Sequence, residues 1–161
     1  MTGKMLLVST QPSSVSRYVR EAVAQAHKVI YEHSMHLFVR PEQVHELILV
    51  HPYSLILSES DLPAYPQYLE AGNKFKHDGR SGLFLLENSI RDKYSNNNET
   101  PVIFFNFQGG AEVEEQIRRY PPVSIYTTAA FGRRPLETAV QMKDEIKSAM
   151  IPKALAHLFA D

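Results

Sequence analysis

The chain has no cysteine, no long apolar run and almost no net charge, and each absence excludes a class of protein. Without cysteine, its 161 residues form no disulfide and carry out no thiolate chemistry, as expected of a cytoplasmic protein. No apolar run approaches the roughly 18 residues of a membrane span, and none resembles a signal peptide, so we expect no membrane association. A formal net charge of -1 gives no general attraction to nucleic acid, and we expect no direct nucleic acid binding.

What is present is an ordinary globular composition, 43% hydrophobic and 22% charged, in a length that suits one domain with its own core. Short apolar runs predict buried strands, because a strand covered on both faces carries few polar residues. The predicted strands cover residues 5–8, 29–31, 54–58, 102–105 and 123–127.

Helical signals stand between these strands. Capping residues, prolines that suit a first helical turn and apolar positions at helical spacing mark where each helix begins. The predicted helices begin at Ser13 or Ser14, at Pro41, near Gly82, at Ala111 and at Pro135. Strands that alternate with helices predict an α/β fold with a parallel sheet and helices on both faces.

In such a fold the functional site lies outside the carboxyl ends of the strands, where the strand order reverses. The segments expected there are Ser9–Pro12, Glu59–Pro63, Asn106–Gly110 and Thr127–Gly132. Two of these segments carry a recognisable pattern. The third predicted strand ends in the acidic Glu59, with Leu62-Pro63 shortly after it, and the first is followed by Ser9-Thr10-Gln11-Pro12.

The other two segments extend that pattern. Asn106 follows the fourth predicted strand, and the fifth carries Tyr126, with Ala129 and Phe131 just beyond it. Over roughly Lys4 to Met150, these segments resemble the receiver domain of the two-component response-regulator family. The resemblance implies a flavodoxin-like doubly wound sandwich over residues 1–150, with five parallel strands in the order 2-1-3-4-5.

The resemblance also assigns positions to the phosphorylation pocket, and the residues found there differ from the family pattern. Glu59 stands at the phosphoacceptor position, which is aspartate in the family. Ser9 and Thr10 replace an acidic pair, Asn106 replaces threonine or serine, and Ala129 replaces a lysine. Phosphoryl transfer to a carboxylate needs a divalent cation and a second positive charge, and the groups that supply them are missing.

We therefore expect a non-enzymatic signalling module, a degenerate receiver without metal or cofactor that works independently of phosphorylation. It would act by binding a protein partner, and we expect it to form a homodimer. Glu59 is either a mimic of a phosphorylated aspartate or a tolerated acidic residue at a strand end. Tyr126 is the expected switch or interface aromatic, and the face formed by the fourth helix, the fifth strand and the fifth helix is the expected interaction surface.

Two segments exceed what a receiver needs. An extended loop at about residues 64–81 contains Tyr65, Tyr68 and Phe75. It is a lid over the pocket, a binding surface, or an insertion held by a few anchoring aromatics. The C-terminal extension, residues 151–161, has the apolar spacing of a short helix.

The sequence also allows other interpretations. The hydroxyl-rich loop from Ser9 to Ser14 precedes a helix, where a phosphate-bearing ligand such as a flavin nucleotide can bind, so a small-molecule sensor is the alternative function. Glu32, His33 and His36 are the closest group of metal-ligand types, although their expected place between a strand and a helix favours solvated histidines. The run Asn96-Asn97-Asn98 predicts a loop tip.

Overall fold

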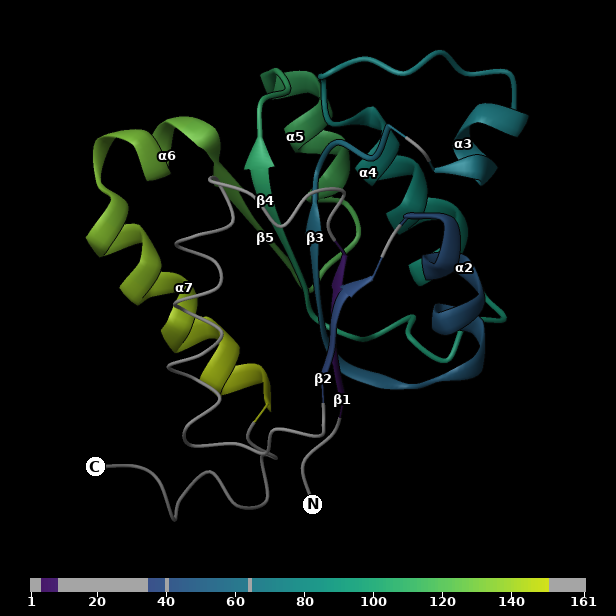
Figure 1. The fold of residues 1–161 in the computed structure, drawn as a ribbon, viewed down its shortest axis with the longest axis horizontal. Helices are drawn as coiled ribbons and strands as arrows, with labels where there is room; N and C mark the ends of the chain where they lie inside the picture. The colour runs from purple at the N-terminus through teal and green to yellow at the C-terminus, as the bar shows by residue number, and fades with distance from the viewer. Residues whose placement is uncertain (1–3, 9–34, 40, 64, 151–161) are drawn as a thin grey trace.

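In a computed structural model, the chain folds into a central sheet between two layers of helices (Figure 1). The model describes residues 4–8, 35–39, 41–63 and 65–150. All strand pairs of the sheet are parallel, and the strands lie in the order β2-β1-β3-β4-β5. The predicted α/β class with a parallel sheet is confirmed.

The five strands sit close to the apolar runs of the sequence. They are β1 (Lys4–Val8), β2 (Met35–Val39), β3 (Tyr53–Glu59), β4 (Val102–Phe107) and β5 (Val123–Thr127). The second strand was expected at 29–31, which lies outside the described residues; the strand that pairs with β1 comes later, at Met35–Val39. His36 therefore belongs to β2 and not to a connection between a strand and a helix.

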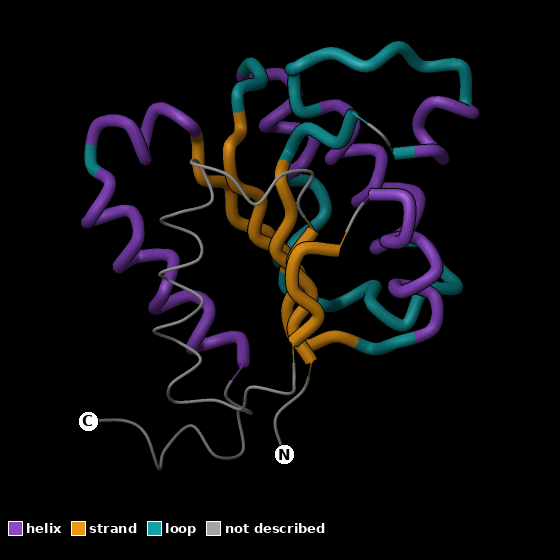
Figure 2. Tube along the Cα trace, viewed as in Figure 1, coloured by secondary structure: helices purple, strands orange, loops and turns teal. Residues whose placement is uncertain are grey.

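Helices cover both faces of the sheet, as Figure 2 shows by colour. One face carries α2 (Pro41–Val50), α4 (Arg80–Leu85) and α5 (Ala111–Ile117), with α3 (Pro66–Glu70) outside α4. The opposite face carries α6 (Thr128–Arg133) and α7 (Pro135–Met150).

Alternating strand residues feed these two layers, because successive side chains of a strand point to opposite faces. On β3, Ile56 joins the core under α2, α4 and α5, whereas Leu55 and Leu57 join the core under α6 and α7. The same alternation places Phe104 of β4 in the first core and Phe105 in the second. Continuous apolar runs are thus explained by burial on both faces.

Helix α7 begins at Pro135 as expected. Thr138, Met142 and Ile146 are buried, and Met142 and Ile146 have no exposed side-chain surface. Leu136 and Val140 are instead 74% and 51% exposed. The helix therefore presents two apolar side chains, one turn apart, on its outer surface.

The long segment before α4 has more structure than the irregular loop that the sequence predicted. It contains α3, which begins at Pro66, and α4 begins two residues before the expected start. The expected helix over residues 82–94 ends earlier, because α4 passes into a π-helical turn, η2, that stops at Ile90. The rings of Tyr65 and Tyr68 both meet Phe84 of α4 edge to face, which fixes α3 against α4.

The asparagine run lies in a turn, as expected of a loop tip, but Asn97 within it is fully buried. Its Oδ1 accepts a hydrogen bond from the Tyr53 amide at 2.7 Å, and its Nδ2 donates to the carbonyls of Ile48 and His51 at 2.7 and 2.9 Å. A buried amide with all these partners ties the end of α2 to the start of β3. Asn96 and Asn98, by contrast, are exposed.

Two ion pairs at i,i+4 spacing join α5 to the residues just after it, Arg118 with Glu114 at 4.0 Å and Arg119 with Glu115 at 3.5 Å. Within the described part of the chain, no helix has the length and apolar character to cross a membrane. The C-terminal extension, residues 151–161, lies outside the described residues, as do Glu32 and His33.

Candidate functional site

The carboxyl ends of β3 and β4 lie side by side at the upper edge of the sheet (Figure 1). Glu59 is the last residue of β3, pairs in register with Phe105 of β4, and is half-buried. Ser60 follows it, fully buried, and its amide and hydroxyl both donate to the Phe105 carbonyl, at 3.0 and 3.3 Å. The chain leaving β3 is therefore bound to β4 beyond the last ladder pair.

Asn106 gives this edge an irregular shape. Its φ of 59° is in the left-handed region, which asparagine tolerates better than most residues. The register between β4 and β5 shifts here: Phe104 faces Ile125, and Phe107 faces Thr127. Among the described residues, no group makes a hydrogen bond to the buried side-chain oxygen of Asn106. Asn106 thus combines a β-bulge with an acceptor that none of these residues uses.

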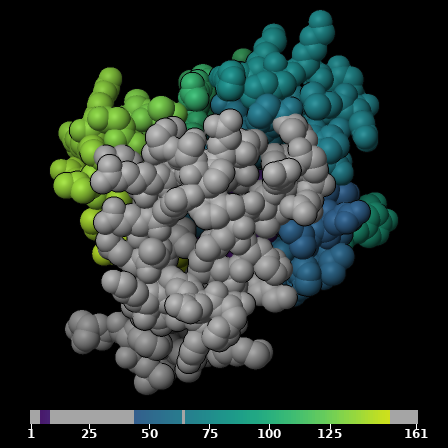
Figure 3. Space-filling view, in the orientation of Figure 1, coloured from purple at the N-terminus to yellow at the C-terminus, as the bar shows by residue number. Residues whose placement is uncertain are grey.

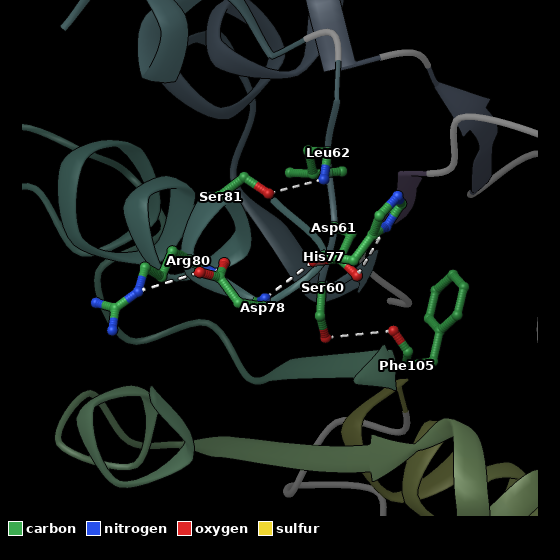
Figure 4. Close-up of polar contacts among 9 residues, drawn as sticks. Ser60, Asp61, Leu62, His77, Asp78, Arg80, Ser81 and Phe105 are labelled. Carbon is green, nitrogen blue, oxygen red and sulfur yellow. Dashed lines mark hydrogen bonds and ion pairs between the residues drawn. The ribbon is translucent and has the colours of Figure 1, made fainter. Parts of the chain in front are cut away.

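Asp61 is the central polar residue of the edge, and sequence reasoning did not select it (Figure 4). Its Oδ1 accepts a hydrogen bond from the Gly79 amide at 2.9 Å, and its Oδ2 lies 3.7 Å from Nδ1 of His77. The adjacent Leu62 amide donates to the Ser81 hydroxyl oxygen at 2.8 Å. The segment after β3 is therefore joined to the residues just before and within α4.

Burial raises the pKa of the Asp61 carboxyl, and this is the largest influence on it. The Gly79 hydrogen bond and the nearby His77 act in the opposite direction. Oδ2 has no hydrogen-bond partner among the described residues, and the His77 side chain is 69% exposed. The carboxylate is therefore held by one backbone donor and by a solvated imidazole 3.7 Å away, which compensate poorly for lost hydration.

The loop between α3 and α4 approaches the residues that end and follow β4, and Figure 1 shows it passing above α3 and α4. Two glycines allow the approach. A Cβ on Gly109 would lie 2.2 Å from the Asp78 carbonyl oxygen, and one on Gly79 would lie 2.6 Å from the Phe107 ring. Gly79 also has a φ of 80°, which favours glycine. The loop is thus packed directly on the residues that follow β4.

The three aromatic residues assigned to this loop have different roles. Tyr65 is fully buried and exchanges a hydrogen bond of 2.8 Å with the Ser89 hydroxyl, and Tyr68 is 6% exposed. Neither residue offers a binding surface, so both are anchors. Phe75 is half-buried, and its ring meets that of His77 at 4.8 Å between centroids. Residues around α3 form the upper right of the molecular surface (Figure 3).

Of the three remaining positions that the resemblance assigns to the pocket, the structure describes one, Ala129. Ala129 lies exposed in α6, a short helix whose first turn is capped by the Thr127 hydroxyl, which accepts from the Ala130 amide at 3.0 Å. No cation therefore stands at this position. Ser9 and Thr10 lie outside the described residues. Among the described residues, no three histidine, aspartate or glutamate side chains come together as metal ligands.

A second place of interest lies on β5, away from the strand ends. Tyr126 is 5% exposed, and its hydroxyl donates to Glu145 Oε1 of α7 at 2.5 Å. Burial, followed by this hydrogen bond, raises the pKa of Tyr126, so the phenol is a neutral donor. A groove of about 290 Å³ runs beside this pair, between the end of α5 and α7.

The sequence singled out the pocket positions by spacing, but it missed the partners of Asp61. The available signal was Asp78-Gly79, an acidic residue and a glycine just before an apolar helix. A glycine at that place is typical of a turn that needs a positive φ.

Comparison with protein-family models, with curated proteins and with solved structures finds no match to the chain.

Proposed function

We propose that the chain is a non-enzymatic signalling module, a degenerate receiver that works by protein–protein interaction without phosphorylation. The observation that carries the proposal is the chemistry at the carboxyl edge of the sheet. Ala129, at the place of the family's lysine, is an exposed alanine in a short helix. Phosphoryl transfer needs positive charge at the transferred group, and this position supplies none.

The closure of the loop on β4 supports the same proposal. Gly109 and Asp78 are in backbone contact, and Asp61 is occupied by the Gly79 amide. The loop therefore covers part of the edge where a phosphodonor would approach a carboxylate. In this proposal Glu59 is a fixed acidic group and not an acceptor.

The finer assignment of the fold belongs to the same proposal. The order β2-β1-β3-β4-β5, with helices on both faces, is the order of a flavodoxin-like doubly wound sandwich. The placement of Glu59 at the end of β3 and of Asn106 at the end of β4 supports the receiver form of that fold. The likeness would then extend over residues 1–150.

We further propose that the module forms a homodimer through the outer face of α7. Leu136 and Val140 are the supporting observation, because two exposed apolar side chains one turn apart can pack against the same pair on a second copy. Such an isologous contact brings each residue close to its own symmetry mate or to the neighbouring apolar residue. The acidic and basic residues around the pair would remain solvated.

The absence of phosphorylation is tested by intact-mass measurement after incubation with acetyl phosphate and Mg²⁺. A functional receiver domain labelled in the same reaction is the control. We expect the control to gain a phosphoryl group and this chain to keep its mass. An acyl phosphate on Glu59 or Asp61 would overturn the proposal.

A further inference from the structure

Strand β5 is an edge strand, and half of its backbone groups have no partner in the sheet. The Val102 amide donates to the Pro122 carbonyl, and Val102 lies in register with Val123. In a parallel ladder this pattern turns the backbone groups of Ser124 and Tyr126 towards β4. The N–H and C=O groups of Val123 and Ile125 therefore point to the open edge.

No hydrogen bond to these outward groups occurs among the backbone contacts of the described residues. The shift in register does not alter the alternation, because the extra residue is on β4, between Phe104 and Phe107. Ile125 lies in the middle of β5, and no described residue engages its N–H or C=O, which leaves both for an added strand.

The open edge lies in the groove already described. The groove is lined on one side by Arg118 at the end of α5, along its floor by residues 124–127 of β5, and on the other side by α7 residues including Gln141 and Glu145. Its volume of about 290 Å³ is at the small end of the range for ligand sites, which is roughly 300–1,000 Å³. A short stretch of extended chain fits such a space.

The helices that flank the edge decide between two occupants. A second copy pairing through β5 would bring its own α5 and α7 to the same place, where they would meet the helices that flank the groove. A single extended segment carries no such helices and reaches the floor. The groove therefore favours a peptide over a second copy of this domain.

The charged groups of the groove indicate the chemistry of that peptide. Among the described residues of the lining, Arg118 supplies the positive charge; its side chain is 54% exposed, and Nη2 lies 4.0 Å from Oε1 of Glu114. Glu145 carries the opposite charge and accepts the Tyr126 hydroxyl. Because a guanidinium has five N–H donors and this ion pair engages one nitrogen, Arg118 keeps donors for a second carboxylate.

We propose that an extended segment of a partner protein binds the β5 edge as an added strand and places an acidic side chain at Arg118. This inference rests on the proposed function, since it gives the interaction module its site. The added strand makes main-chain hydrogen bonds to Ile125. Because successive amides of a strand point to opposite sides, binding depends on every second amide of the peptide.

The test begins with random linear peptides displayed on phage and selected on the full-length protein. We expect enriched peptides with alternating apolar positions and an aspartate or glutamate. For the best binder, Ile125→Pro removes the outward N–H, and Ile125→Ala is the control that shortens the side chain but keeps that N–H. The affinity of Ile125→Pro for the peptide should be at least about tenfold lower than that of Ile125→Ala, because the proline variant loses one or two main-chain hydrogen bonds.

The peptide itself provides a measurement that does not depend on how the variants fold. N-methylation of the amide that pairs with Ile125 should abolish binding, whereas methylation of the next amide should leave it intact. Arg118→Glu should lower the affinity for the acidic peptide and raise the affinity for the same peptide with lysine in place of the acidic residue.

Three results would overturn the edge site. They are no enrichment, binding that is indifferent to the position of N-methylation, and a preference for acidic peptides that survives Arg118→Glu. A protein that dimerises without enriching any extended peptide would retain the proposed function and lose this site. A dimer that dissociates in Ile125→Pro but not in Ile125→Ala would make a second copy the occupant, which also contradicts the inference.

Discussion

The Tyr126 hydroxyl donates to Glu145 at 2.5 Å and so joins the edge strand β5 to the helix α7 that covers it. Both residues also border the groove beside β5. A tyrosine whose ring is buried and whose hydroxyl is engaged couples the position of α7 to that of β5. Any partner that moves one of these elements therefore acts on the other.

Replacing Tyr126 tests this link. Tyr126→Phe keeps the buried ring but leaves the Glu145 carboxylate without its donor, and we expect a loss of about 1–2 kcal/mol of unfolding free energy. Chemical denaturation at pH 7 measures it. Because the pKa of Tyr126 is raised, the hydroxyl contributes stability below its unfolded pKa of about 10, which is lost as the pH rises further. The stability gap between the wild type and the variant should therefore narrow above pH 10, and a gap that stays constant would contradict this.

Asp61 should destabilise the protein at neutral pH. Its folded pKa is raised by burial, so its contribution to stability is greatest below the unfolded value of 3.8 and declines as the pH rises through the folded pKa. Asp61→Asn keeps an acceptor for the Gly79 amide and removes the ionised form. The variant should melt above the wild type at pH 7 and together with it near pH 3.

Asp78→Asn is the matched control for that comparison. Asp78 is the neighbouring carboxylate, it is half-buried, and it pairs with Arg80 at 3.2 Å. Its replacement should not raise the melting temperature at pH 7. An Asp61→Asn protein that is less stable than the wild type at pH 7 would show that the interaction with His77 outweighs the cost of burial.

Asn97 should be required for stability. Its side chain makes hydrogen bonds to Tyr53, Ile48 and His51, so Asn97→Ala leaves several buried backbone groups without partners. We expect a loss of about 3 kcal/mol in unfolding free energy by chemical denaturation. Asn98→Ala, at an exposed position of the same run, should change it by less than about 0.5 kcal/mol. Equal effects of the two substitutions would contradict the buried role.

Gly109 should be required for loop closure. A Cβ at this position would lie 2.2 Å from the Asp78 carbonyl, so Gly109→Ala forces the loop away from β4 at a cost of about 1–3 kcal/mol. Gly110→Ala is the control, because nothing lies within 4 Å of its added Cβ. Hydrogen exchange of the Gly79 amide should accelerate in the first variant only, and unchanged exchange there would show that the loop is held by other contacts.

Four of the five strands were predictable from the sequence, because a strand buried on both faces is a short apolar run. Leu55, Ile56 and Leu57 illustrate this, since consecutive residues supply opposite cores. The second strand was expected at 29–31, whereas β2 lies at Met35–Val39. The beginnings of α2 and α7 were predictable for a different reason, because Pro41 and Pro135 fit the first helical turn and little else.

The sequence does not predict features that tertiary contacts decide. Asn97 belongs to a polar run, and it is buried because it contacts chain segments more than 40 residues away. Asp61 could not be selected because its partner Gly79 comes from a loop whose path the sequence does not determine.

The native mass of the freshly purified protein distinguishes an interaction module from a ligand-binding domain. We expect a homodimer without a bound small molecule, which Leu136→Asp converts into monomers. A single chain that carries an additional small mass would contradict it. That result would mean that the fold serves to bind a small molecule.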